Sequence, residues 1–232
     1  MVTKVIQKEK EEKISIPHLI NDFLFKNRRI ILVILAVLVA ALIVIITYVV
    51  IVEKKNTAAI TKIEDIIESW DEARLDNKSA ALAALTVTED ALLEQLDSLV
   101  KGNRRLSSGA RANLVAAEIY HSRKDWKNAK NSYLACAKTK PEMYMAPLGY
   151  YNAAVCAEEL GEADQAIALY AKALDHDAFK MKSRALFNMG RVEEQRGNSI
   201  VAIEFYEKMT EQFPDDSWTL LAKSRIIALE IQ

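Results

Sequence analysis

Hydrophobic and polar positions follow a different pattern on each side of residue 53. Residues 30–52 contain no charge, glycine or proline, and Thr47 and Tyr48 are their only polar groups. As an α-helix rising about 1.5 Å per residue, this run would be roughly 34 Å long, enough for a hydrocarbon core of about 30 Å. A signal peptide has a shorter apolar core, about 7–15 residues, followed by small residues at the cleavage site. The run ends in bulky residues instead, so we expect an uncleaved transmembrane helix.

Beyond residue 52 the chain has the composition of an all-α protein. Glycine and proline number only six and four in the whole sequence, whereas Ala, Leu, Glu and Lys, which favour helices, are abundant. We expect three helix pairs, 110–123 with 126–139, 147–160 with 163–175, and 182–196 with 199–212. A terminal helix from Pro214 to about Ile231 would cover the last apolar face, with Trp218, Leu221, Ile226 and Leu229.

Small and aromatic residues recur in register along these pairs. Ala129, Ala166 and Ala202 are 37 and 36 residues apart, and a tyrosine follows each of them after four residues. Twelve positions before each of these alanines lies a small residue, and five positions before each lies a residue that ends the preceding helix. Twelve positions after them come Pro141, Ala178 and Pro214. The tyrosines are Tyr133, Tyr170 and Tyr206, the small residues Ala117, Ala154 and Gly190, and the helix-ending residues Lys124, Gly161 and Gly197. Small residues let two helices approach closely, and the tyrosines would fill the space between successive pairs.

These residues at this period resemble the tetratricopeptide repeat, a helix–turn–helix unit of about 34 residues. The units here are slightly longer, and the tryptophan of the first helix is missing. The resemblance implies an α-solenoid of about three helix pairs plus a terminal capping helix.

The resemblance also implies a binding site. In tetratricopeptide arrays the first helix of each pair lines a concave groove, and exposed aromatic anchors ringed by Arg and Glu suit the capture of a peptide or helix. Alternatively, any one of these residues packs against the terminal helix or a neighbouring repeat. The residues carried over are Arg111, Leu114, Glu118 and His121 from the first repeat, Leu148, Tyr151, Val155, Glu158 and Glu159 from the second, and Arg184, Phe187, Arg191 and Glu194 from the third.

Charge around the apolar run predicts its orientation. Residues 1–29 hold seven bases against four acids, and Lys26, Arg28 and Arg29 lie next to the run. Five bases lie within twenty residues before the run and three within twenty after it. Because Lys and Arg favour the cytoplasmic side, we expect a cytoplasmic N-terminus and an exported C-terminal part.

Four regions follow from these patterns. Residues 1–29 would be a cytoplasmic basic tail with a juxtamembrane amphipathic helix, capped by Ser15, and residues 30–52 the transmembrane helix. Residues 53–109 would be a helical linker or a degenerate repeat, and residues 110–232 the tetratricopeptide domain. The apolar face of the amphipathic helix would comprise Ile16, Leu19, Ile20, Phe23 and Leu24.

The 53–109 region has helix signals of its own. Residues 57–75 read as a helix continuing from the membrane. A capping box at 86–89 (Thr-Val-Thr-Glu) would start a helix over 91–100, and residues 101–109 would form a loop.

Catalytic and cofactor chemistry has no basis in the sequence. His18, His121 and His176 have no metal-ligand partners at helical spacing, and neither a phosphate-binding glycine loop nor a serine elbow is present. Residues 53–232 hold 24 bases against 28 acids, which argues against a nucleic-acid partner. We therefore expect a non-enzymatic protein with no cofactor, metal or small-molecule substrate. Cys136 and Cys156 occupy packing positions of the repeats and are expected to be buried, although a bridge between them is an alternative.

The architecture as a whole resembles the YfgM-type ancillary subunits of the bacterial Sec translocon. That resemblance implies a single-pass protein of the bacterial inner membrane with a cytoplasmic N-terminus and a periplasmic repeat domain. It would link translocon subunits to periplasmic chaperones or secreted clients, and residues 30–52 would contact lipid. A scaffold for an envelope assembly complex, serving outer-membrane proteins or the cell wall, is the alternative. A cytosol-facing import receptor would require the reverse topology.

Overall fold

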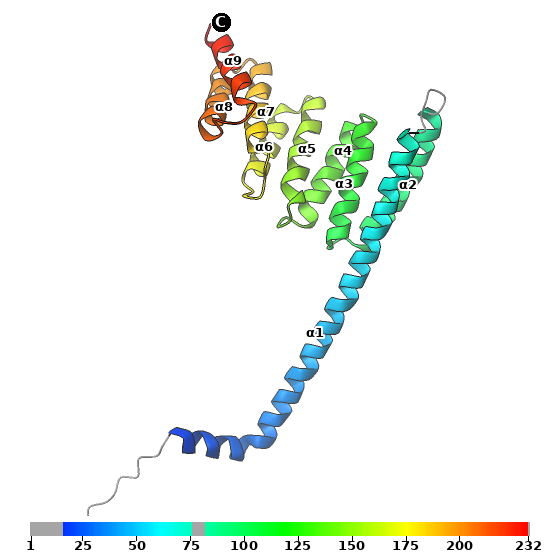
Figure 1. Cartoon of the computed structure of the whole chain (residues 1–232), viewed down its shortest axis with the longest axis vertical. Helices are drawn as coiled ribbons and strands as arrows, with labels where there is room; N and C mark the ends of the chain where they lie inside the picture. Colours follow the sequence, from blue (N-terminus) through cyan, green and yellow to red (C-terminus); the bar gives the residue numbers. More distant parts are fainter. Residues whose placement is uncertain (1–15, 76–81, 232) are drawn as a thin grey trace, which may run out of the picture. The chain divides into compact units, whose positions relative to one another are not determined.

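The computed structural model describes residues 16–75 and 82–231, whose regular elements are all α-helices (Figure 1). The chain divides into two compact units, residues 1–53 and 54–232, and the first helix contributes residues to both. The predicted all-α class is confirmed for the described residues. The helices are α1 (Ile16–Leu75), α2 (Leu82–Gly102), α3 (Ser107–Ser122), α4 (Trp126–Thr139), α5 (Met145–Glu159), α6 (Ala163–Leu174), α7 (Lys182–Gln195), α8 (Ser199–Gln212) and α9 (Thr219–Glu230).

The first unit contains the apolar run within α1. The helix has an 18-residue stretch long and apolar enough to cross a membrane, and none of that stretch is buried within the protein. The Thr47 hydroxyl donates to the Ile43 carbonyl at 2.8 Å, so this polar side chain is satisfied inside the helix. No helix end occurs at residue 30 or 52, so the short amphipathic helix predicted ahead of the run is the first part of α1. Ser15, its predicted cap, lies outside the described residues.

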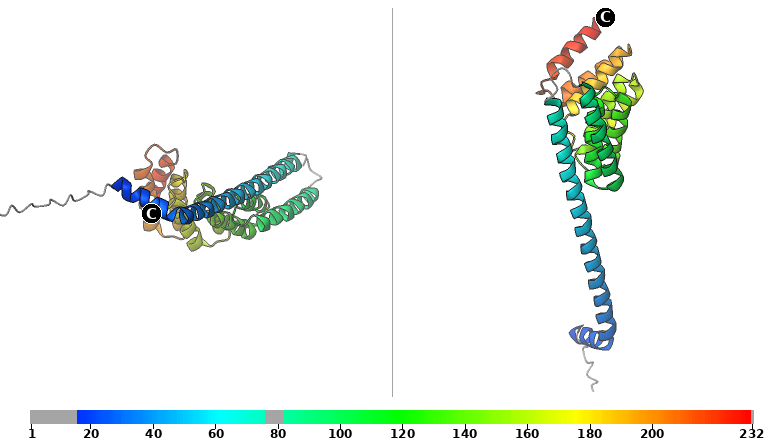
Figure 2. Two further views of the ribbon diagram at one scale, coloured as in Figure 1. Left: turned by 90° about the horizontal axis from the view of Figure 1, so that it is seen from below. Right: turned by 90° about the vertical axis from the view of Figure 1, so that its right-hand side faces the viewer.

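The second unit contains the three predicted helix pairs. They are α3 with α4, α5 with α6, and α7 with α8, and each helix packs against the next along the chain (Figures 1 and 2). The terminal helix starts later than predicted, at Thr219 instead of Pro214. The preceding turn is fixed by Asp216, whose carboxylate accepts from the Trp218 backbone N–H at 2.9 Å and the Ser183 hydroxyl at 2.7 Å.

The predicted capping box at 86–89 is wrong. Helix α2 begins at Leu82 and runs through this segment, and the Thr88 hydroxyl donates to the Ala84 carbonyl within the helix. Glu89 is buried and accepts from Trp70 Nε1 at 2.8 Å and from Arg123 Nε at 2.5 Å. The predicted loop over 101–109 is also shorter, because α2 extends to Gly102 and α3 begins at Ser107.

Helix α2 and residues 54–75 of α1 pack together against α3. Asn56 Oδ1 accepts from the Ser107 hydroxyl at 3.1 Å and the Ser108 backbone N–H at 3.0 Å, which satisfies the start of α3. The predicted helix over 57–75 is present and ends at Leu75. These residues therefore form a packed helix pair, and its reading as a degenerate repeat stays a prediction. The apolar cluster that joins the three helices comprises Ile63, Ile66, Trp70, Leu92, Leu96, Ala112, Val115 and Ile119.

Each repeat tyrosine contacts the first helix of its own pair, Tyr133 at His121, Tyr170 at Tyr151 and Tyr206 at Gly190. The predicted contact between successive pairs is present at Tyr170, whose hydroxyl accepts from Asn188 of α7 at 3.1 Å. All three tyrosines of the register are buried, and so are the alanines aligned with them. A Cβ added to Gly190 would lie 2.6 Å from Tyr206 Cε1, so the ring occupies the space that a side chain would need. The turn positions share a left-handed backbone, with φ of 59° at Lys124, 72° at Gly161 and 79° at Gly197.

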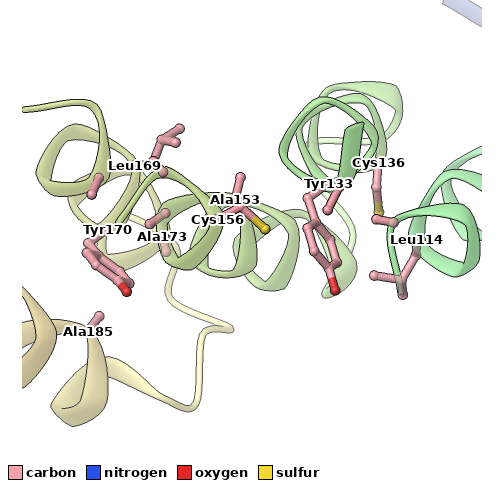
Figure 3. Close-up of a cluster of buried hydrophobic side chains, with 14 of the residues drawn as sticks. Leu114, Tyr133, Cys136, Ala153, Cys156, Leu169, Tyr170, Ala173 and Ala185 are labelled. Carbon is pink, nitrogen blue, oxygen red and sulfur yellow. The ribbon is translucent and has the colours of Figure 1, made fainter. Parts of the chain in front are cut away.

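The core of the second unit has three apolar clusters. Beside the N-terminal cluster, the largest spans α3 to α7, and a third joins α7, α8 and α9 around Tyr206. Cys136 and Cys156 are buried free thiols in the largest cluster, so the predicted packing role is confirmed. In Figure 3 the Tyr133 ring lies between the two sulfur atoms. Burial raises the pKa of both thiols to about 12.

Candidate partner-binding surface

The predicted groove residues form four aligned positions on the first helices of the repeats. Helices α3, α5 and α7 each supply one residue to a position, and we call the whole set the first-helix surface. Its positions are Arg111, Leu148 and Arg184; Leu114, Tyr151 and Phe187; Glu118, Val155 and Arg191; and His121, Glu158 and Glu194. Glu159 lies beside them and is exposed.

The residues at the last of these positions contact the repeat tyrosines. Tyr170 donates its hydroxyl proton to Glu158, and Tyr206 donates to Glu194 at 2.9 Å. Burial, reinforced by the bond to Glu158, raises the pKa of Tyr170. In the first repeat His121 replaces the carboxylate and packs edge-on against Trp126 at a centroid distance of 5.0 Å. These residues stabilise each helix pair, so little of them is available to a partner.

The same carboxylates also connect successive helix pairs. Arg191 in α7 forms an ion pair with Glu158 in α5, and Arg225 in α9 forms one with Glu194 in α7. Each arginine therefore reaches back to the carboxylate of the preceding repeat. We call these two ion pairs the inter-repeat ladder. Arg225 was missed from the sequence because α9 lies outside the three aligned repeats.

Two of the predicted groove residues, Leu114 and Phe187, are buried, so the expectation of an exposed aromatic anchor is wrong for Phe187. Leu114 is buried in the largest cluster. Phe187 is only 5% exposed, because its ring packs on Tyr206 and Trp218 at centroid distances of 5.3 and 5.0 Å. Trp218 comes from the segment that follows the last repeat, which is why the repeat alignment alone left Phe187 uncovered.

The first position is engaged at both ends of the array. Arg111 forms an ion pair with Glu64 of α1 at 2.5 Å. Arg184 is exposed, with its guanidinium 5.6 Å from the Trp218 ring centroid, a cation–π arrangement. Leu148 lies between them in the alignment and is half-buried.

The central repeat thus retains the accessible apolar part of the surface. Leu148, Tyr151 and Val155 are spaced three and four residues apart on α5, share one helical face and are each half-buried. The Tyr151 ring packs on Tyr170 and Phe179, and its hydroxyl accepts from Asn188 Nδ2 at 3.1 Å. We call these three residues the α5 stripe.

Charges of both signs neighbour the α5 stripe along the aligned positions. Glu118 is exposed to solvent over part of its surface. Partial desolvation of its carboxylate raises its pKa; the positive charge of Arg111 opposes this rise and the negative charge of Asp71 adds to it. On the other side Arg184 and Arg191 carry positive charge. An elongated ligand with an apolar centre and charged ends would match this order.

The second unit also has an open pocket outside the first-helix surface. An open pocket of about 560 Å³ lies between α1 and α2 and is lined by Lys62, Asp65, Ile66, Ser69, Leu92, Gln95, Ser98 and Leu99. In the described part of the chain, no group of three or more His, Cys, Asp or Glu side chains could hold a metal ion.

Stacked antiparallel helix pairs with a repeated small-residue and tyrosine register define a helical-repeat protein. The profile of the Tetratricopeptide repeat matches residues 149–177, which span α5 and α6. A "TPR repeat-containing protein" of Treponema pallidum (strain Nichols) is 32% identical over 184 residues, covering 75% of this chain and 77% of that protein. The chain belongs to the tetratricopeptide repeat family, whose members are generally non-catalytic protein–protein interaction modules.

Two solved structures match this chain over part of its length. The crystal structure of MamA covers 66% of this chain and 83% of its own, with 17% identity and a TM-score of 0.49. That of YrrB, described as a TPR protein with an unusual peptide-binding site, covers 73% of this chain and 97% of its own, with 20% identity and a TM-score of 0.30.

Proposed function

We propose that this chain is an interaction protein held at a membrane by residues 30–52, with the α5 stripe as the anchor point for a partner peptide or helix. The observation that carries the proposal is the accessible apolar face of α5, within a family whose repeats bind proteins. Apolar side chains that pack into a surface pocket dominate binding free energies, and charged neighbours select the register.

The membrane attachment is supported by the exposure of the apolar run in α1. None of its 18-residue apolar stretch is buried among the described residues, and its one threonine hydroxyl is satisfied by the helix backbone. Lys26, Arg28 and Arg29 ahead of the run favour a cytoplasmic N-terminus. Since the relative comes from a bacterium, the inner membrane and a periplasmic repeat domain follow as our proposal.

The partners that we propose are translocon subunits, together with periplasmic chaperones or secreted clients. The support is architectural, namely a short basic tail, one apolar span and a small acidic repeat array. The scaffold of an envelope assembly complex shares this architecture and is distinguished by the partner that is captured.

Photo-crosslinking from α5 tests the partner. A photoreactive residue at Leu148 should capture one partner in cells, because this side chain is accessible and makes no polar contact that the replacement would break. The same residue at Lys138, exposed on the second helix α4, is the matched control. Translocon or chaperone adducts specific to position 148 would support the proposal. Envelope-assembly proteins would favour the scaffold, and equal capture from both positions would contradict the α5 stripe as the site.

Cysteine labelling tests the topology separately. Both native thiols are buried, so an introduced cysteine should be the reactive one. In spheroplasts, a membrane-impermeant maleimide should label Val87→Cys, whereas Lys8→Cys should react only after permeabilisation. The reverse pattern would overturn the exported orientation and leave the binding surface untouched.

A further inference from the structure

Helix α9 has two apolar faces. One face packs into the third cluster through Ala222, Ile226 and Leu229. The opposite face carries Leu220, Ile227 and Ile231, which are 79%, 57% and 80% exposed. Ser224 lies between them on this exposed face, and Ile231 follows the helix with helical backbone angles. None of the described residues covers this face.

The spacing of the exposed face is palindromic. Residues 220, 224, 227 and 231 are separated by four, three and four positions. When two copies of such a helix pair antiparallel, Leu220 of one lies opposite Ile231 of the other, and Ser224 lies opposite Ile227. The small serine side chains then leave room for the isoleucines, as knobs-into-holes packing requires.

The flanks of the face are also self-complementary. On one flank, exposed Lys223 and Glu230 lie seven residues apart, so antiparallel pairing places each lysine near the glutamate of the other copy. On the other flank, antiparallel pairing places Leu221 of one copy near Ala228 of the other, and this pair extends the apolar contact. A two-fold interface requires that one surface complement itself, and opposite charges at its edge fix the register.

We propose that the exposed face of α9 is a homodimer interface in which two copies pair antiparallel through Leu220, Ser224, Ile227 and Ile231. A hetero-partner would need no palindromic spacing and no pairing of Lys223 with Glu230, so these features select a second copy. Attachment of both copies to one membrane would raise their effective concentration and favour the pair. The dimer leaves the α5 stripe, which lies on a different helix, outside the contact.

Sedimentation equilibrium of the full chain in density-matched detergent tests the proposal. The wild-type protein should show a concentration-dependent monomer–dimer equilibrium. Ile227→Glu should raise the dissociation constant at least about tenfold, since it places a charge in the centre of the apolar contact. Val87→Glu, at an exposed apolar position of α2, should leave the constant unchanged.

A charge exchange tests the register. Lys223→Glu and Glu230→Lys should each weaken the dimer, and the double variant should restore it because the two charges have traded places. Circular dichroism of every variant checks that the helices persist; where Ile227→Glu loses helix, Leu220→Lys replaces it. A monomeric wild type, a dimer indifferent to Ile227→Glu, or a double variant no tighter than the single ones would overturn the proposal.

Discussion

At the residue scale, three turn positions show how one backbone requirement is met by different side chains. Lys124, Gly161 and Gly197 all have positive φ at the end of a first helix. Only glycine adopts this region without steric cost, and other L-residues are disfavoured by roughly 1–2 kcal/mol. The first turn therefore carries backbone strain that the two glycine turns avoid.

Lys124→Gly should relieve that strain. We expect a gain of about 1 kcal/mol in the free energy of unfolding, or an increase of roughly 2–4 °C in melting temperature for a domain of this size. Thermal unfolding followed by circular dichroism measures the shift. Lys208→Gly, exposed in the interior of α8, is the control and should destabilise the protein by a similar amount. A melting temperature that falls in both variants would contradict the assigned turn.

At Gly190 the requirement is for space, because the Tyr206 ring lies where a side chain would be. Gly190→Ala should destabilise the protein by about 1–3 kcal/mol, because the new Cβ meets the buried Tyr206 ring and neither can move freely. Gly102→Ala is the control, since no atom lies within 4 Å of its Cβ position and α2 ends there. Denaturant unfolding of both variants provides the comparison, and equal stabilities would rule out the close approach.

At the scale of helices, the structure separates binding positions from packing positions that look alike in the sequence. Phe187→Ala should cost about 3–5 kcal/mol of stability, because it empties the space between Tyr206 and Trp218. Leu148→Ala should cost far less and reduce partner capture instead. Chemical denaturation measures the loss of stability, and the yield of crosslinking from a photoreactive residue at the exposed neighbour Glu159 measures partner capture. A stable Phe187→Ala variant with impaired capture would return Phe187 to the binding surface.

The repeat register predicted the three helix pairs well, because small residues, tyrosines and turn residues recur locally at a fixed period. Positions decided by distant segments could not be found in this way. Glu89 was read as a capping residue because its partners, Trp70 and Arg123, lie on other helices. Phe187 was read as exposed because Trp218 covers it from beyond the repeats. The inter-repeat ladder was missed for the same reason.

At the scale of the whole molecule, the second unit is a chain of nearest-neighbour contacts. From α2 to α9 each helix packs on the next, and the inter-repeat ladder ties α5 to α7 and α7 to α9. In such arrays, stability is approximately the sum of repeat terms and interface terms. A change at one interface is therefore felt mainly by its immediate neighbours.

The division of the core into three clusters also sets an order of opening. Helices α8 and α9 belong to the third cluster, which has neighbours on one side only among the described residues. Their amide protons should exchange with solvent as one cooperative group and earlier than those of α4 to α6, which lie within the largest cluster. Hydrogen exchange followed by mass spectrometry would resolve the two groups, whereas a single common rate would mean that the array opens only as a whole. A transient unfolding of α8 and α9 would remove the dimer face of α9 while α5 stays folded. The protein would then lose its dimer contact and keep its α5 stripe.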